Sequence, residues 1–255
     1  MNRYFCDLHI HSCLSPCGDQ DSTPANIAGM AALNGLNIVA LTDHNTSKNC
    51  PAFFVHAKAR GLIPVAGMEL TTSEDVHVIC LFRTLEDAME FDSFVDGRRI
   101  KVKNRPEIFG DQFIMDENDE KCGEDGYLLI NATDLSIDEA FDEVAKRNGA
   151  CYPAHIDRQA NGIVSTLGTF PESPAFSCYE LNDDGNDGEY RERFPVLSGL
   201  RKVVSSDAHY LWNISEAQFA IELDDEPYSS QLVRDRLIDY LQGKTSPETE
   251  GRDNG

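Results

Sequence analysis

Six of the seven histidines in this chain lie in five short clusters that also contain carboxylates. Most clusters come directly after an apolar run that is typical of a strand. Imidazole and carboxylate ligands without a thiolate pair suit Zn, Fe or Mn, so the pattern predicts a site for divalent metal ions. The clusters are Asp7-Leu8-His9-Ile10-His11-Ser12, Thr42-Asp43-His44-Asn45, Glu69 with His77, Ala154-His155-Ile156-Asp157 and Ser206-Asp207-Ala208-His209.

The spacing within two clusters indicates how ligands share an ion. His9 and His11 are two residues apart on a predicted strand, where side chains at i and i+2 point to the same face. Asp207 and His209 repeat this spacing on a later strand. Six imidazoles and at least two carboxylates exceed the needs of one ion. We therefore expect two or three ions that share a bridging carboxylate.

The other ligand candidates lie near strand ends. His44, His155 and Glu69 each lie at the carboxyl end of a predicted strand, and the carboxyl ends of the strands hold the active site in α/β barrels. His77 opens its strand instead, and only a strand that runs the other way would bring it to the others. His56 lies on a predicted helix without a carboxylate motif and is interpreted as structural or exposed. Ordinary strand histidines are the alternative interpretation of each cluster taken alone.

The elements that must position these residues alternate between strand and helix. Strands are predicted over residues 4–11, 38–42, 62–68, 77–82, 150–154, 178–181, 202–205 and 219–223. Helices are predicted from Thr23-Pro24, from Lys48, from the capping box at Ser136 and from Ser230. This order implies a mostly parallel sheet, open or closed into a barrel. Residues 83–134 are interpreted as an insertion over the barrel mouth with a small hairpin, and residues 244–255 as a disordered tail.

The composition limits the classes of partner. The 255 residues include 22 basic and 44 acidic ones, for a net charge of −22, so long nucleic acids are not expected to bind. A small anionic substrate is compatible with this charge if metal ions reverse the field in a cleft. Eight irregularly spaced cysteines predict reduced thiols in a cytoplasmic protein. No signal pattern and no membrane-spanning run is evident, and nothing predicts an oligomeric state.

Together, the motifs resemble those of the PHP (polymerase and histidinol phosphatase) family. The first motif is similar to Asp7–Ser12, the second to Thr42–His44, the third to Glu69 with His77, and the last to Ser206–His209. The resemblance covers positions 7–209. It implies a distorted (β/α)7 barrel forming a single domain over residues 1–243. It also implies a trinuclear metal centre and hydrolysis of phosphoesters by a hydroxide that bridges the ions and attacks phosphorus.

The resemblance also assigns ligands. It implies a first ion held by His9, His11, Glu69 and Asp207, a second held by Glu69, His77 and His155, and a third held by His44 and His209. The chain departs from the family where an Asp usually follows the second histidine by five residues. Pro16 occupies that position here, and Asp19 is our candidate replacement, with Cys17 and Asp21 as weaker ones. If none of them reaches the third ion, that site is weak or empty.

Several further roles are hypotheses. Asp7 and Asp43 are candidates to orient ligating imidazoles, or are simple turn and cap carboxylates. His209 or His44 could protonate the leaving oxygen if it is not committed to metal. Family members usually show His-Pro where this chain has His155-Ile156-Asp157-Arg158. Arg158 could bind a substrate phosphate, or form a surface salt bridge. The basic run 98–105 is interpreted as a solvated loop in preference to a second phosphate site.

The function that we expect is hydrolysis of a small phosphorylated metabolite or nucleotide. Three alternatives stay open: an exonuclease-like phosphodiesterase on short oligonucleotides, a metal hydrolase of C–N bonds, and a non-catalytic metal-binding module. The separate carboxylate at Glu69 and the Asp207/His209 pair favour the phosphoesterase over the C–N hydrolase.

Overall fold

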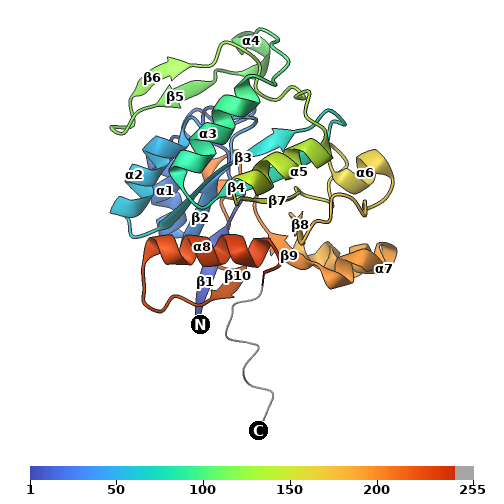
Figure 1. Ribbon diagram of the computed structural model, residues 1–255. Helices are drawn as coiled ribbons and strands as arrows, with labels where there is room; N and C mark the ends of the chain where they lie inside the picture. Colours follow the sequence, from blue (N-terminus) through green and yellow to red (C-terminus); the bar gives the residue numbers. More distant parts are fainter. Residues whose placement is uncertain (245–255) are drawn as a thin grey trace.

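The computed structural model describes residues 1–244, so the tail predicted at 244–255 lies, but for its first residue, outside the described residues. Strands and helices alternate around a curled sheet (Figure 1). The strands are β1 (Asn2–Asp7), β2 (Ile38–Leu41), β3 (Ile63–Thr71), β4 (His77–Phe82), β5 (Phe113–Met115), β6 (Lys121–Glu124), β7 (Ala150–Pro153), β8 (Cys178–Leu181), β9 (Arg201–Val204) and β10 (Ala220–Leu223). The α-helices are α1 (Pro24–Leu33), α2 (Cys50–Ala59), α3 (Leu85–Asp96), α4 (Pro106–Phe109), α5 (Ile137–Lys146), α6 (Ile163–Leu167), α7 (Asp187–Arg193) and α8 (Ser230–Leu241).

Seven strands surround the centre of the molecule. Six strands form one sheet in the order β10-β1-β2-β3-β4-β7, and β8 pairs with β9 in parallel. Two links near the carboxyl ends join these sheets: the Ile156 amide donates to the Glu180 carbonyl at 2.9 Å, and Ile10 bridges to Ala208. The ring is therefore β1-β2-β3-β4-β7-β8-β9, with β10 attached outside it. The prediction of a distorted (β/α)7 barrel is confirmed.

Strand direction in the ring explains the position of His77. β1, β2 and β3 are mutually parallel, whereas β4 runs antiparallel to both of its neighbours, β3 and β7. The start of β4 therefore lies beside the carboxyl ends of the other strands. His77 pairs with Thr71 at that end, so the reversed strand brings it to the remaining clusters.

The core has two layers because side chains alternate between the two faces of each strand. Inward residues such as Ile38, Ala40 and Ile79 form one buried cluster, which α8 closes with Val233 and Leu237. Outward residues of the same strands form a second cluster with the inner faces of α1, α2, α3 and α5. Figure 1 shows α8 across the end where the strands begin, which leaves the opposite end for the site.

Local sequence signals account for most helix starts. Thr23 caps α1 by accepting a hydrogen bond from the Asn26 amide, with Pro24 in the first turn. Ser136 and Glu139 form the predicted capping box at α5. Two strand ends differ from the prediction by more than one residue. β1 ends at Asp7, so His9 and His11 lie in the segment beyond it, whereas β3 continues past Glu69 to Thr71 because β4 pairs with it. The prediction that Asp207 and His209 lie on a strand is wrong, because β9 ends at Val204 and Asp207 has a φ angle of 52°.

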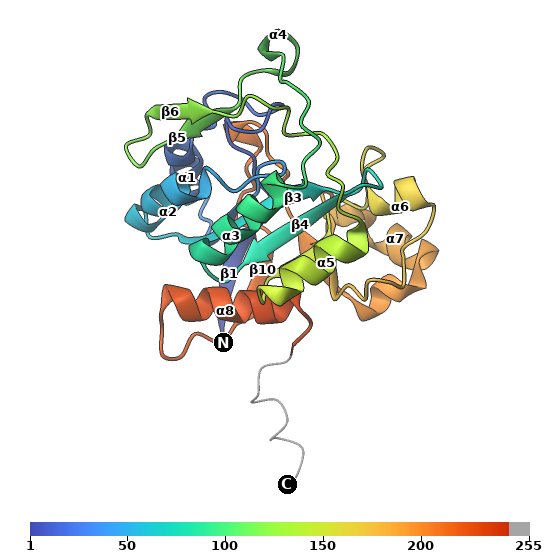
Figure 2. The same cartoon turned by 45° about the horizontal axis from the view of Figure 1, so that its top comes forward.

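The segment 83–134 has two parts. Its first part forms α3, which packs against β3 and β4. Its second part contains α4 and the β5–β6 hairpin, and Figure 2 shows both at the end where the strands terminate. The Phe113 amide donates to the Cys13 carbonyl at 3.0 Å, and the Asn45 side chain donates to the carbonyls of Leu129 and Asn131 at 2.6 and 2.8 Å. These bonds fix the second part beside the loops that follow β1 and β2.

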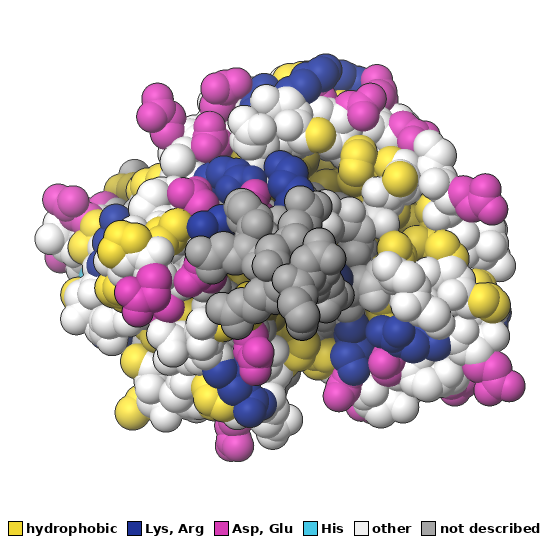
Figure 3. All heavy atoms as spheres, turned by 60° about the horizontal axis from the view of Figure 1, so that its bottom comes forward, with side chains coloured by type: hydrophobic (Ala, Val, Ile, Leu, Met, Phe, Trp, Pro, Cys, Tyr) yellow, Lys and Arg dark blue, Asp and Glu magenta, His cyan; other side chains and the backbone are white. Residues whose placement is uncertain are grey.

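Within residues 1–244, no helix is both long and apolar enough to cross a membrane. Figure 3 shows the face where the strands begin, on which acidic, basic and hydrophobic side chains mix and no histidines gather on the visible described surface. The six clustered histidines lie at the other end of the barrel, and five of them are buried.

Candidate metal centre

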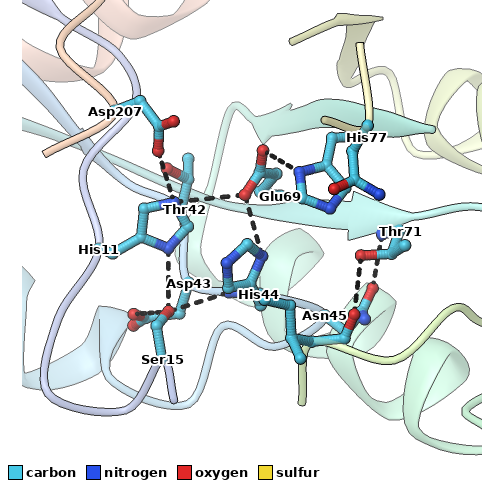
Figure 4. Close-up of polar contacts among 12 residues, drawn as sticks. His11, Ser15, Thr42, Asp43, His44, Asn45, Glu69, Thr71, His77 and Asp207 are labelled. Carbon is cyan, nitrogen blue, oxygen red and sulfur yellow. Dashed lines mark hydrogen bonds and ion pairs between the residues drawn. The ribbon is translucent and has the colours of Figure 1, made fainter. Parts of the chain in front are cut away.

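Glu69 on β3 lies at the middle of the site, and its side chain is 1% exposed. Its two oxygens approach five imidazoles that come from four different parts of the chain. Figure 4 shows three of them, those of His11, His44 and His77. A carboxylate in this position can bridge ions on its two sides. Oε1 lies 2.7 Å from His77 Nδ1, 2.9 Å from His155 Nε2 and 3.4 Å from His9 Nε2, and Oε2 lies 2.9 Å from His44 Nδ1 and 3.3 Å from His11 Nε2.

On one side of Glu69, four potential ligand atoms converge. His9 Nε2 and His11 Nε2 are 3.1 Å apart, and Asp207 Oδ1 lies 3.3 Å from the first and 3.1 Å from the second. With Glu69 they form a buried group whose ligand atoms all lie within 4.8 Å of one another. These are the residues that the family resemblance implies for a first ion.

Hydrogen bonds on the outer ring nitrogens define the tautomers of both histidines. The Glu180 carboxylate lies 2.8 Å from His9 Nδ1 and must accept, so Nδ1 of His9 carries the proton. Ser15 Oγ donates to Asp43 Oδ1 at 2.8 Å and so accepts from His11 Nδ1 at 2.9 Å. When each ring carries only this proton, both Nε2 atoms are lone-pair acceptors that point at each other. A second proton on either ring must leave before an ion binds there.

This arrangement fits a cation. Two lone pairs 3.1 Å apart and two carboxylates repel one another unless positive charge lies between them. Near them, Glu69 Oε2, Asp207 Oδ1, His44 Nδ1 and His77 Nδ1 are buried, and none has a partner with hydrogen-bond geometry among residues 1–244. Native proteins rarely leave buried polar atoms without partners. The residues present therefore fit divalent ions coordinated by nitrogen and oxygen.

Two further groups of ligand atoms share members with the first. His44, Glu69 and His77 form one, and His11, His44 and His209 form the other. His155 approaches the first of these through its 2.9 Å contact with Glu69. The number of ligand atoms again exceeds the needs of a single ion.

The pKa values show that the cluster attracts positive charge. Burial alone would lower the pKa of His11, but hydrogen bonds with Asp207 and Glu69 outweigh it and raise the pKa to about 9. Burial would raise the pKa of Glu69, yet the surrounding imidazoles hold it well below its usual range. Burial lowers the pKa of His44 to about 3, and burial together with the charge on His11 lowers that of His209 to about 4. Near neutral pH His44 and His209 are thus neutral, as metal ligands must be.

Three residues at the site have a left-handed backbone conformation that non-glycine residues seldom adopt. Their φ angles are 26° at His155, 52° at Asp207 and 52° at Asn45. Two hydrogen bonds hold Asn45 in this conformation. Its side-chain Oδ1 accepts from the Thr71 amide at 2.8 Å, and its backbone amide donates to the Glu69 carbonyl at 2.9 Å. Such strain persists where the surroundings fix the backbone, and it is typical of functional sites.

The two carboxylates expected to orient imidazoles have different roles. Asp43 accepts from the amide and hydroxyl of Ser12, each at 2.7 Å, and reaches His11 only through Ser15. Among residues 1–244, Asp7 forms no hydrogen bond with an imidazole: it accepts from the Ser206 amide at 3.1 Å and the Ser215 amide at 3.0 Å. Asp7 therefore holds the loop that carries Asp207 and His209.

Asp19 is not brought into any of the three ligand groups. Its amide donates to the His209 carbonyl at 2.9 Å, but its Oδ1 accepts from the Asp21 amide at 2.8 Å, as in an Asx turn. The loop around Pro16 thus passes the group formed by His11, His44 and His209. The Asp19 side chain, however, is engaged in the Asx turn through its Oδ1.

Arg158 and the basic run lie in different environments. Arg158 is 45% exposed, and its Nη1 lies 2.6 Å from Asp207 Oδ2, so it borders the metal centre. In the basic run, Arg99 is buried against Asp125 at 2.9 Å, and Arg98 and Lys101 pair with acidic residues. Arg99 therefore stabilises the packed segment over the mouth of the barrel. Nearby carboxylates neutralise the charges of Arg98, Arg99 and Lys101.

Sequence reasoning missed Glu180, Ser15 and Asn45. The only signal for Glu180 was a charged residue within the apolar run of β8. Ser15 and Asn45 carry no signal, because their roles depend on contacts with β2, β3 and the segment over the mouth.

A barrel whose carboxyl end gathers histidines around one buried carboxylate defines an α/β-barrel protein with His, Asp and Glu clusters able to bind metal ions. Residues 7–145, more than half of the chain, match the PHP domain. The chain belongs to the PHP domain family, whose members include metal-dependent hydrolases.

Known proteins that resemble the chain differ in length and activity. An error-prone DNA polymerase from Symbiobacterium thermophilum is 36% identical over 77 residues, which are 30% of this chain and 7% of the polymerase. The lesion-specific endonuclease PfuEndoQ from Pyrococcus furiosus has a TM-score of 0.65 at 17% identity, and the alignment covers 96% of this chain and 57% of that one. A proposed metal-dependent phosphoesterase from Bifidobacterium adolescentis has a TM-score of 0.56 at 18% identity, over 84% of this chain and 88% of that one. The chain thus spans less than two thirds of the polymerase and of the endonuclease.

Proposed function

We propose that this protein hydrolyses phosphoesters with two to three divalent ions, Zn, Mn or Fe, and that its substrate is a small phosphorylated metabolite or nucleotide. The observation that carries the proposal is the contact of Glu69 with five imidazoles. A carboxylate with imidazole nitrogens beside each of its two oxygens is suited to bind neighbouring ions that act together on one substrate. Bound in that way, divalent ions lower the pKa of water and neutralise the charge of a phosphoryl group.

The residues at the mouth would bind and orient the substrate. Arg158 pairs with Asp207 through one nitrogen, so the other N–H groups of its guanidinium are available to a phosphate. The neutral state of His44 and His209 favours a ligand role over that of a proton donor. His209 is the better candidate for protonating the leaving oxygen, because its side chain is 21% exposed whereas that of His44 is 3% exposed.

Two aromatic residues favour nucleotides within this substrate class. The rings of Tyr210 and Trp212 stack with centroids 4.9 Å apart, and both side chains are exposed directly after His209. An exposed aromatic pair is a sequence-tolerant platform for a nucleobase. The net charge of −22 favours a mononucleotide or short oligonucleotide over a long strand.

Cytoplasmic location is part of the same proposal. All eight cysteines are free thiols in the described residues, and six of them are buried. A reducing compartment keeps such thiols free.

The test is hydrolysis of a phosphoester panel by the purified protein with added Mn or Zn. The panel contains sugar phosphates, mononucleotides, cyclic phosphates and short oligonucleotides, with an EDTA control. His9→Ala should abolish turnover and lower the metal content, whereas His56→Ala, which changes a histidine on α2 away from the centre, should retain both. Turnover in His9→Ala equal to that of His56→Ala would overturn the proposal, as would a metal-loaded protein that hydrolyses nothing in the panel.

A further inference from the structure

Glu180 is a fully buried carboxylate in the middle of β8. The same oxygen, Oε1, lies 2.8 Å from His9 Nδ1 and 3.1 Å from the His155 amide nitrogen. Its two hydrogen bonds therefore go to two of the proposed metal ligands. One ligand is contacted at its side chain and the other at its backbone.

The surroundings of Glu180 do not otherwise compensate its charge. In the part of the chain that the structure describes, Oε2 has no hydrogen-bond partner, and the only ion pair of Glu180 is with His9. A carboxylate that is buried without an opposite charge strongly destabilises a fold. The positive charge that compensates Glu180 therefore lies on the side of His9, either on its ring or on an ion bound at its Nε2.

Glu180 also bears on the backbone of His155. The φ angle of 26° at His155 is strained for a residue with a side chain. The hydrogen bond from the His155 amide to Glu180 holds this conformation, and in it His155 Nε2 reaches Glu69 at 2.9 Å.

We propose that Glu180 is a positioning residue of the metal centre. It keeps His9 in the tautomer with a proton on Nδ1, so that the Nε2 lone pair is available to an ion, and it fixes the backbone of His155 on the other side of Glu69. One carboxylate thus orients ligands of two adjacent ion positions. The inference rests on the proposed metal-dependent function but concerns metal binding and not turnover.

The test compares metal binding by two variants of the full chain. Glu180→Met has a similar size and removes the acceptor, so His9 Nδ1–H loses its partner, and we expect affinity for Zn²⁺ to fall by about 100-fold. Glu180→Gln keeps a neutral oxygen that can accept from His9, and we expect a loss of about 10-fold. Affinity is measured by competition with a chromophoric chelator. The visible absorption of the Co²⁺-loaded protein should also change in the order wild type, Gln, Met.

The matched control is Asp225→Asn. Asp225 is also buried and accepts from Tyr4 Oη and Asn2 Nδ2, both at 2.7 Å, but it lies just after β10, at the start of β1. This variant should lower thermal stability without changing Zn²⁺ affinity or the Co²⁺ spectrum. If Glu180→Met does not fold, Glu180→Gln decides the question alone.

Wild-type affinity and an unchanged Co²⁺ spectrum in the folded Glu180 variants would overturn the inference, as would an equal loss of affinity in Asp225→Asn. The outcomes separate the two proposals. Weakened metal binding in a protein that hydrolyses no phosphoester would uphold the role of Glu180 and overturn the proposed function. Metal-dependent turnover with unchanged affinity in both variants would do the reverse.

Discussion

Replacing Ser15 by Ala tests whether hydrogen bonds to the outer ring nitrogens of the proposed ligands control metal binding. Ser15 Oγ connects three groups: it donates to Asp43 Oδ1 at 2.8 Å, and accepts from His11 Nδ1 at 2.9 Å and from the His44 amide at 3.2 Å. Asp43 keeps two donors from Ser12 in the variant. The Nδ1–H of His11 keeps no acceptor, although its ring is fully buried.

The size of the effect follows from that unpaired group. A buried donor without a partner costs about 1–3 kcal/mol. His11 can avoid this cost by moving its proton to Nε2, but then Nε2 no longer offers a lone pair to an ion. Because about 1.4 kcal/mol corresponds to a factor of ten, we expect Zn²⁺ affinity to fall by about 10- to 100-fold.

The assay is chelator competition, with Ser22→Ala as the matched control. Ser22 lies in the same loop and is also buried, but its hydroxyl has no hydrogen-bond partner in the described residues. Its removal should leave metal affinity unchanged. Equal affinities for Ser15→Ala and Ser22→Ala would refute the reasoning.

Three further changes probe substrate binding and stability. Arg158→Ala should raise KM for phosphoesters with intact metal content, since Arg158 borders the centre without being a proposed ligand; an unchanged KM would show that its pairing with Asp207 is only structural. Trp212→Ala should raise KM for mononucleotides more than for sugar phosphates, and a parallel change would argue against base stacking. Burial would raise the pKa of Asp125, but hydrogen bonds from Arg99 and Lys48 hold it below its usual range. The interactions of the Asp125 carboxylate therefore stabilise the protein above the unfolded pKa of about 4, and this stabilisation is lost as pH falls further. Asp125→Asn should therefore cost about 3 kcal/mol at neutral pH and flatten the decline of the free energy of unfolding below pH 4, as measured by urea denaturation.

The sequence predicted the barrel and the members of the centre for a physical reason. Ligands of a barrel site must follow strands, and strands are visible as apolar runs, so the positions of His44 and His155 beside carboxylates were informative. The i, i+2 spacing brought His9 and His11 together even though β1 ends before them. From this segment both Nε2 atoms approach Glu69 and Asp207.

The supporting contacts could not be predicted in the same way. Glu180 contacts a histidine 171 positions earlier, and only the closed ring brings them together. Asp7 stands two residues before His9 and appeared suited to orient it, yet the backbone turns its carboxylate to the amides of Ser206 and Ser215. Sequence spacing thus constrains neighbours on one strand but not partners across the ring.

The closure of the ring has a consequence for how the fold opens. Along the strands themselves, the six-stranded sheet and the β8–β9 pair are separate ladders, and they join near the rim through Ile156 with Glu180 and Ile10 with Ala208. Both joints lie within one residue of proposed ligands, at His155 and at His9, His11, Asp207 and His209. Few backbone hydrogen bonds join the β8–β9 pair to the six-stranded sheet. The free energy of local unfolding of this pair should therefore depend more than that of the other strands on ions bound by the neighbouring ligands. Ion binding and closure of the barrel would then be a single linked equilibrium.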